Sequence, residues 1–120
     1  MKFSEMTYTR PDPEASKQQL SALTEELKSA GSYEEARKVF LSQQELMSHI
    51  STAATLASIR HSIDTRDAFY DGEEKFWNNF NPELEEYNQA WTAAMLESPF
   101  RADFEQEYGD LMFLNAEIAL

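Results

Sequence analysis

A cluster of polar side chains in the run ASIRHSIDTRD, residues 57–67, holds the groups best suited to chemistry in this sequence. His61 and Asp64 are three positions apart and so share one helical face, where they could bind a metal ion if another helix supplied further ligands. Di-iron sites in helical bundles use a glutamate three residues before a histidine. Here the two corresponding positions hold Leu46 and Ser58. The pattern therefore favours a structural role over a metal site.

In that structural role, the cluster fixes a turn between two long helices. Arg60 would pair with Asp64, Asp67 would pair with a neighbouring arginine or the backbone, and His61 would donate to a carbonyl. Elsewhere the sequence has no glycine-rich phosphate loop, no GxSxG turn and no HExxH zinc motif. We therefore predict no catalytic, cofactor-binding or metal-binding residue in this chain.

The composition indicates a single all-α domain over residues 1–120. A chain of this length supports one hydrophobic core, and its 42% hydrophobic residues include eight Phe, five Tyr and two Trp that favour burial over disorder. Only three glycines and four prolines occur among many strong helix formers.

The charge balance excludes several classes of partner. Twenty-two acidic residues against ten basic ones give a net charge of −12, which repels nucleic acids and anionic membranes. The sequence has no cysteine, no apolar leader segment and no apolar run long enough to span a membrane. We expect a cytoplasmic protein without nucleic-acid or membrane partners.

Helix-capping signals place the first two helices. Asp12 before a proline predicts an N-cap for a helix over 13–29, which Gly31 would end in the left-handed conformation. Ser32 and Glu35 form a capping box, in which each side chain satisfies the other residue's backbone N–H, at the start of a long second helix that ends near residue 63. That helix is apolar on two sides, and its second side consists of Leu56, Ile59 and Ile63.

A third helix, also long, follows over about 67–97. Pro82 lies inside it without disturbing the apolar phase, so we expect one helix kinked near Pro82. Its inward residues are Phe69, Phe76, Phe80, Leu84, Tyr87, Trp91 and Met95. The acidic runs Glu73–Glu74, Glu83–Glu86 and Glu105–Glu107 are expected to be solvated helix faces.

The C-terminal part predicts two further helices. Ser98 and Pro99 would open a short helix that runs through about Glu107 and ends at Gly109, and Asp110 would cap the last run, LMFLNAEIAL. The aromatic residues expected to point inward are Phe100, Phe104 and Tyr108. These elements make either antiparallel helical hairpins or a bundle of four to five helices.

The last run has eight apolar residues in ten, more than one buried face requires. Together with the second apolar side of the long helix over 33–63, it indicates surface suited to pack against further chain. The alternatives are that the bundle closes on itself or that a second copy covers this surface in a homodimer.

Three stretches resemble a known family: MKFSEMTYTRPD, STAATLASIRHSIDTRDAFYD and SPFRADFEQEYGDLMFLNAEIAL. They are similar to the N-terminal region of bacterial oligoendopeptidase F type zinc peptidases, relatives of thimet oligopeptidase. The likeness covers the whole chain but only the first part of such an enzyme. It implies a helical enzyme whose deep channel admits short peptides, with zinc held by an HExxH helix and a downstream glutamate in the later part of the sequence.

The resemblance implies that these helices form part of the channel wall and lid without a catalytic role of their own. The partners would be the remaining catalytic part of the same polypeptide and, for the parent enzyme, zinc and short peptides. A stand-alone helical interaction or dimerisation module is the alternative function, and a small carboxylate metal bundle is a third.

Overall fold

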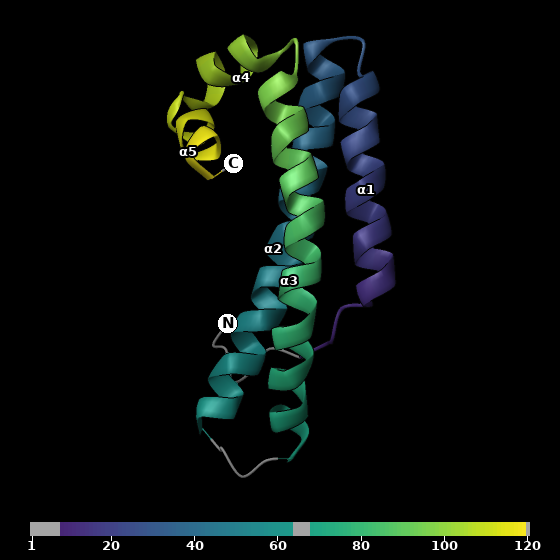
Figure 1. Ribbon diagram of the computed structural model, residues 1–120, viewed down its shortest axis with the longest axis vertical. Coiled ribbons are helices and arrows are strands. Elements are labelled where there is room, and N and C mark those ends of the chain that lie inside the picture. Colours follow the sequence, from purple (N-terminus) through teal and green to yellow (C-terminus); the bar gives the residue numbers. More distant parts are fainter. Residues whose placement is uncertain (1–7, 64–67, 120) are drawn as a thin grey trace.

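The computed structural model describes residues 8–63 and 68–119, and five helices contain most of them (Figure 1). The helices are α1 (Pro13–Ser29), α2 (Tyr33–Ile63), α3 (Ala68–Glu97), α4 (Arg101–Tyr108) and α5 (Leu111–Ala119). No strand occurs in the described residues. The predicted all-α fold with two long helices is confirmed.

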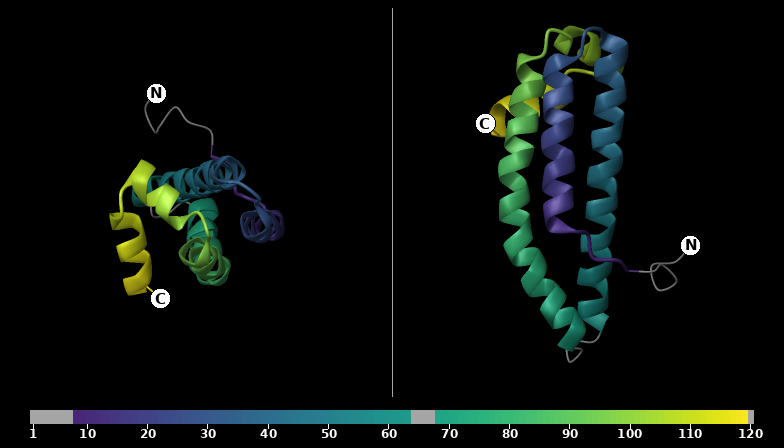
Figure 2. Two further views of the ribbon diagram at one scale, coloured as in Figure 1. Left: turned by 90° about the horizontal axis from the view of Figure 1, so that it is seen from above. Right: turned by 90° about the vertical axis from the view of Figure 1, so that its right-hand side faces the viewer.

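The three longer helices pack side by side and run antiparallel in succession (Figures 1 and 2). The α2–α3 hairpin extends beyond the start of α1, and the lead-in that begins at Tyr8 passes along this extension (Figure 1). At the opposite end, α4 and α5 fold back beside the bundle. The molecule is elongated, with principal extents of 50 × 28 × 25 Å.

Helix α1 begins as its sequence predicts and ends differently. The Asp12 side chain accepts a hydrogen bond of 3.0 Å from the Ala15 backbone N–H, which confirms the N-cap. At the other end, Ala30 adopts φ −59° and ψ 131°, and its N–H donates to the Leu27 carbonyl. The extended backbone at Ala30 ends the helix, so the prediction that Gly31 does so at positive φ is wrong.

The N-cap at Asp12 supplies the first stability prediction. Asp12→Ala is expected to lower the free energy of unfolding by about 1 kcal/mol, because an amide donor in the first turn of α1 loses its acceptor. Urea denaturation followed by circular dichroism measures the change. Asp12→Asn keeps an acceptor oxygen and should lie within about 0.5 kcal/mol of the wild type; equal losses in the two variants would contradict a capping role.

The capping box at the start of α2 is present with one changed partner. The Ser32 hydroxyl accepts from the Glu35 N–H at 3.2 Å, as predicted. The Glu35 carboxylate, however, accepts from the N–H of Gly31 at 2.8 Å rather than from that of Ser32. The pair therefore ties the α1–α2 turn to the first turn of α2.

Helix α3 continues through Pro82, which confirms one long helix across this proline. Its ribbon bows instead of breaking (Figure 2). Most of the predicted inward series is buried or half-buried, but Phe69 is 57% exposed and Tyr87 is 36% exposed. Trp77, which the predicted series omits, is buried.

Helix α4 begins at Arg101, two residues after the predicted first position. The Ser98 hydroxyl accepts from the Phe100 N–H at 3.1 Å, so this serine stabilises a turn that precedes the helix. Gly109 ends α4 as predicted, with a φ of 88° that disfavours other residues. Of the three aromatic residues predicted to point inward, Phe104 is fully buried and Tyr108 is 41% exposed.

The core lies between α1, α2 and α3 and continues under α4 and α5. Its buried members include Leu20, Leu27, Phe40, Ile50, Trp77, Phe80, Leu84, Trp91, Met95, Phe104 and Phe113. Leu56, which the sequence places on an uncovered second side of α2, is 3% exposed and borders a cavity between the lead-in, α1 and α2. That part of the predicted surplus surface is therefore buried within the chain.

Candidate functional site

The most buried charged side chain of the described residues is Glu73, in the second turn of α3. It is 1% exposed, so the prediction of a solvated Glu73–Glu74 run is wrong for its first member. The helical period explains this burial: Glu73 is four positions before Trp77 and seven before Phe80, both of which are buried, and so lies on the inward face. That spacing is the sequence signal that could have identified it.

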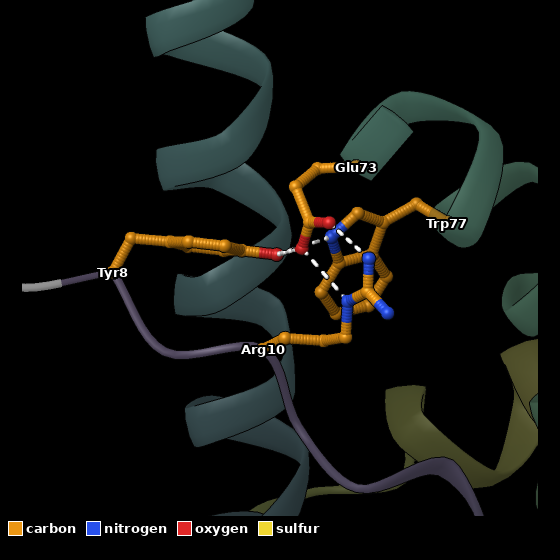
Figure 3. Close-up of polar contacts among 4 residues, drawn as sticks. All are labelled: Tyr8, Arg10, Glu73 and Trp77. Atoms are coloured by element: carbon orange, nitrogen blue, oxygen red, sulfur yellow. Dashed lines mark hydrogen bonds and ion pairs between the residues drawn. The ribbon is translucent and has the colours of Figure 1, made fainter. Parts of the chain in front are cut away.

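Glu73 binds two residues of the lead-in, far away in sequence (Figure 3). The Tyr8 hydroxyl donates to Glu73 Oε1 at 2.6 Å, and Arg10 donates through Nε to Oε1 at 2.9 Å and through Nη2 to Oε2. Trp77 Nε1 donates in turn to the Tyr8 hydroxyl at 3.3 Å. We call Tyr8, Arg10, Glu73 and Trp77 the lead-in clamp, because they fasten residues 8–10 to α3.

The charges in the lead-in clamp are fixed by these contacts. Hydrogen bonds from Arg10 hold the pKa of the Glu73 carboxyl below its ordinary value. Burial, followed by the hydrogen bond to Glu73, raises the pKa of Tyr8 to about 12. Arg10 also lies 4.4 Å from the centroid of the Phe76 ring, which favours its positive charge. A buried carboxylate that already accepts three hydrogen bonds is suited to hold structure and poorly placed to take a proton from a substrate.

Tyrosine ionisation tests this description. Burial and the contact with Glu107 also raise the pKa of Tyr33 to about 12, so Tyr8 and Tyr33 should ionise later than an ordinary tyrosine with a pKa of 10. A near-ultraviolet absorbance titration should show a late phase that Tyr8→Phe and Tyr33→Phe each reduce. A late phase that neither variant reduces would contradict the contacts.

Two further ionic clusters involve the short helices: one attaches α4 to α2, and the other joins α4 to α5. Glu107 accepts from the Tyr33 hydroxyl and from Arg37 Nε, at 3.0 Å for the latter. Arg101 pairs with Glu105 at 2.8 Å and with Glu117 at 2.5 Å. These groups are partly exposed, and their geometry serves docking of the short helices.

The cavities of the described chain contain little reactive chemistry. One of about 670 Å³ lies between the lead-in, α1 and α2, and its titratable lining residues are Asp12 and His49. Another of about 330 Å³ lies between α2, α3 and α5 and is lined mainly by apolar and amide side chains. No described cavity brings together a nucleophile, a base and an orienting group.

The polar cluster in residues 57–67, which the sequence indicates as the best candidate for chemistry, lies largely outside the residues that the structure describes. Asp64 and Asp67 lie outside the described residues, as do the side chains of Arg60 and His61, so the polar cluster stays a prediction. Among the side chains that the structure describes, no three histidine, aspartate or glutamate residues converge as metal ligands would. Over the same residues, no helix has the length and apolar character that crossing a bilayer requires.

The fold and its contacts define an elongated helical domain whose buried charges serve structure. Comparison with known proteins gives its family: the chain matches the Peptidase M3 N-terminal domain over residues 3–120 and belongs to that family. The predicted resemblance is thereby confirmed. No match is found among curated protein sequences.

Solved structures show the same relationship. An oligoendopeptidase F from Bacillus anthracis str. Ames is 36% identical, with a TM-score of 0.93 over 98% of this chain and 22% of that protein. A second oligoendopeptidase F structure gives the same identity and TM-score over 21% of its length. A PZ peptidase A solved with an inhibitor is 33% identical, with a TM-score of 0.92 over 97% of this chain. The chain thus spans about a fifth of these relatives.

Proposed function

We propose that this chain is the non-catalytic N-terminal helical part of a zinc-dependent oligoendopeptidase, in which it forms part of the channel wall and the lid. The observation that carries the proposal is the match over nearly the whole chain to about a fifth of two oligoendopeptidase F structures. The remaining four fifths of such an enzyme would supply the catalytic machinery and bind short peptides. The absence of cysteine agrees with a cytoplasmic location, which belongs to the same proposal.

The bundle suits the role of a wall. Helices α2 and α3 have 31 and 30 residues, and at 1.5 Å per residue each spans about 45 Å. Three antiparallel helices with a common core make a stiff, long surface, and the lead-in clamp fastens residues 8–10 to it.

Zinc has no fitting site in the described part of this chain. A zinc ion in a peptidase polarises the substrate carbonyl and activates a water molecule, which requires three protein ligands and an open position. Residues 8–63 and 68–119 present no such group of ligands. We therefore assign no step of peptide hydrolysis to these residues.

A peptidase assay tests the proposal. The 120-residue chain, incubated with zinc and a short fluorogenic peptide, should release no product, whereas the full-length enzyme that contains it should hydrolyse the peptide and lose activity with a chelator. The coding sequence beyond Leu120 should also encode an HExxH helix. Hydrolysis by the isolated chain, or a coding sequence without that helix, would contradict the proposal.

The alternative, a stand-alone interaction module, is favoured by one observation: three large apolar residues of α5 are exposed. A coding sequence that stops near residue 120 and a chain that associates with itself would favour this alternative.

A further inference from the structure

Helix α5 is apolar on two opposite sides, and the bundle covers only one of them. Its inner side places Phe113 in the core, with Met112 packed against it. Its outer side carries Leu111, Leu114 and Ile118, which are 67%, 47% and 84% exposed. We call these three residues the outer stripe. They are spaced three and four positions apart, so they form one continuous row along the helix.

The outer stripe fits an apolar helix. Rows at this spacing pack into the groove of a second helix, and a helix that is apolar on both sides is normally buried on both. Helix α5 has the most apolar composition of the five helices, which agrees with burial on both of its sides.

The charges around the outer stripe restrict the partner. Helices α4 and α5, with the turn between them, contain one arginine and five carboxylates; Arg101 pairs with Glu105 and Glu117, and Glu107 pairs with Arg37 of α2, which leaves Asp103 and Asp110 as the unpaired charges of this segment among the ion pairs of the described residues. A second copy of this chain would bring the same net-acidic segment against its own, and each copy carries a net charge of −12. Like charges at a contact are unfavourable, whereas lysine or arginine beside the partner's apolar row would be complementary.

The size of the outer stripe also disfavours association of separate molecules. Three partly exposed side chains offer roughly 300 Å², whereas a stable interface between separate proteins buries about 800 Å² on each partner. A segment of the same polypeptide needs far less area, because its covalent connection makes the contact intramolecular. The relatives have about four fifths of their length outside the matched region, so such a segment exists in them.

We infer that the outer stripe docks an apolar helix with basic flanks, supplied by the part of the oligoendopeptidase polypeptide that lies outside this chain. The inference rests on the proposed function and deepens it, since it names the surface through which the N-terminal part joins the rest of the enzyme. Helix α5 would then be held between the bundle and that segment.

Thiol accessibility tests the inference, because the chain has no cysteine of its own. Leu114→Cys and Ile118→Cys each introduce one thiol, and the labelling rate is measured by peptide mass mapping in the isolated chain and in the full-length enzyme. Labelling should be fast in the isolated chain and at least about tenfold slower in the full-length enzyme. In urea, the two proteins should label equally.

The outcomes separate this inference from the proposed function. Equal labelling in an active full-length peptidase would overturn the docking surface and leave the proposed function intact. Concentration-dependent protection in the isolated chain would instead identify a second copy as the partner and overturn the inference. A full-length product without peptidase activity would remove the proposed function itself.

Charge substitutions provide a second readout. In the full-length enzyme, Leu114→Glu with Ile118→Glu should raise the labelling rate of a thiol at Leu111→Cys by about tenfold, because the added carboxylates oppose burial. Gln18→Glu, which adds the same type of charge at an exposed position of α1, should not change that rate. An effect of equal size from Gln18→Glu would show that net charge, not the outer stripe, is responsible.

Discussion

Replacing Phe104 with alanine is expected to lower the free energy of unfolding by about 4 kcal/mol, the largest effect of any substitution considered for this chain. Phe104 is fully buried, and its ring centroid lies 5.0 Å from that of Tyr33 and 5.3 Å from that of Phe40. It also packs near the ring of Phe113 at 6.5 Å, so the same side chain joins α2, α4 and α5. Urea denaturation followed by tryptophan fluorescence measures the loss.

The matched control is Phe69→Ala. Phe69 is 57% exposed, so the same change in side chain should cost no more than about 1 kcal/mol. Near-ultraviolet circular dichroism should also lose aromatic signal in Phe104→Ala, because the packed rings around it become mobile. Similar losses of stability in both variants would show that Phe104 is not a packing centre.

Replacing Arg10 with methionine is expected to cost about 2 kcal/mol. Removing one partner of a buried ion pair costs about 3 to 5 kcal/mol, because it leaves a buried charge uncompensated. The Glu73 side chain is almost inaccessible and would lose its cationic partner, although the Tyr8 hydroxyl would still donate to it. The Arg10 side chain is half exposed, so part of the pair is already solvated and the expected loss is smaller.

A double-mutant cycle isolates this contact. Glu73→Gln in the Arg10→Met background should restore part of the lost stability, because a neutral amide is less costly to bury than an unpaired carboxylate. Additive losses in the double variant would contradict direct coupling between the two residues.

The pH dependence of stability is a second test of the Arg10–Glu73 pair. Because the pKa of Glu73 is lower in the folded chain than its ordinary value of 4.5, the unfolded chain binds a proton first as the pH falls. The contribution of Glu73 is therefore complete above about pH 4.5 and is lost below it. Stability of the wild type should fall more steeply on acidification than that of Glu73→Gln, as measured by urea denaturation at several pH values.

Local signals in the sequence predicted most of the helix boundaries. Asp12 followed by proline, and Ser32 followed by Glu35, each provide a side-chain acceptor for backbone donors within one turn, so a short stretch of sequence decides the outcome. Two similar predictions are wrong: Gly31 does not end α1, and Ser98 does not cap α4. The backbone at Ala30 ends α1 before Gly31, and Ser98 caps a turn instead of a helix.

The lead-in clamp could not be predicted from local signals. The apolar spacing around Glu73 indicates that it faces inward, but nothing near it in sequence identifies Arg10 as its partner, because 63 residues separate the two. Which cation reaches a buried carboxylate depends on how the lead-in passes over the α2–α3 hairpin. That path is a tertiary property, so neither helix propensity nor charge pattern contains it.

The separation of 63 positions between Arg10 and Glu73 also decides which contacts can form first while the protein is synthesised. A chain emerging from the ribosome presents its N-terminus first, so Tyr8 and Arg10 leave the exit tunnel long before Glu73. Helices α1 and α2 are neighbours in sequence and can pair before α3 is complete, whereas residues 8–10 can reach Glu73 only after α3 has been translated and has folded beside them. The lead-in clamp can therefore form only after α3, although two of its residues are translated before α1.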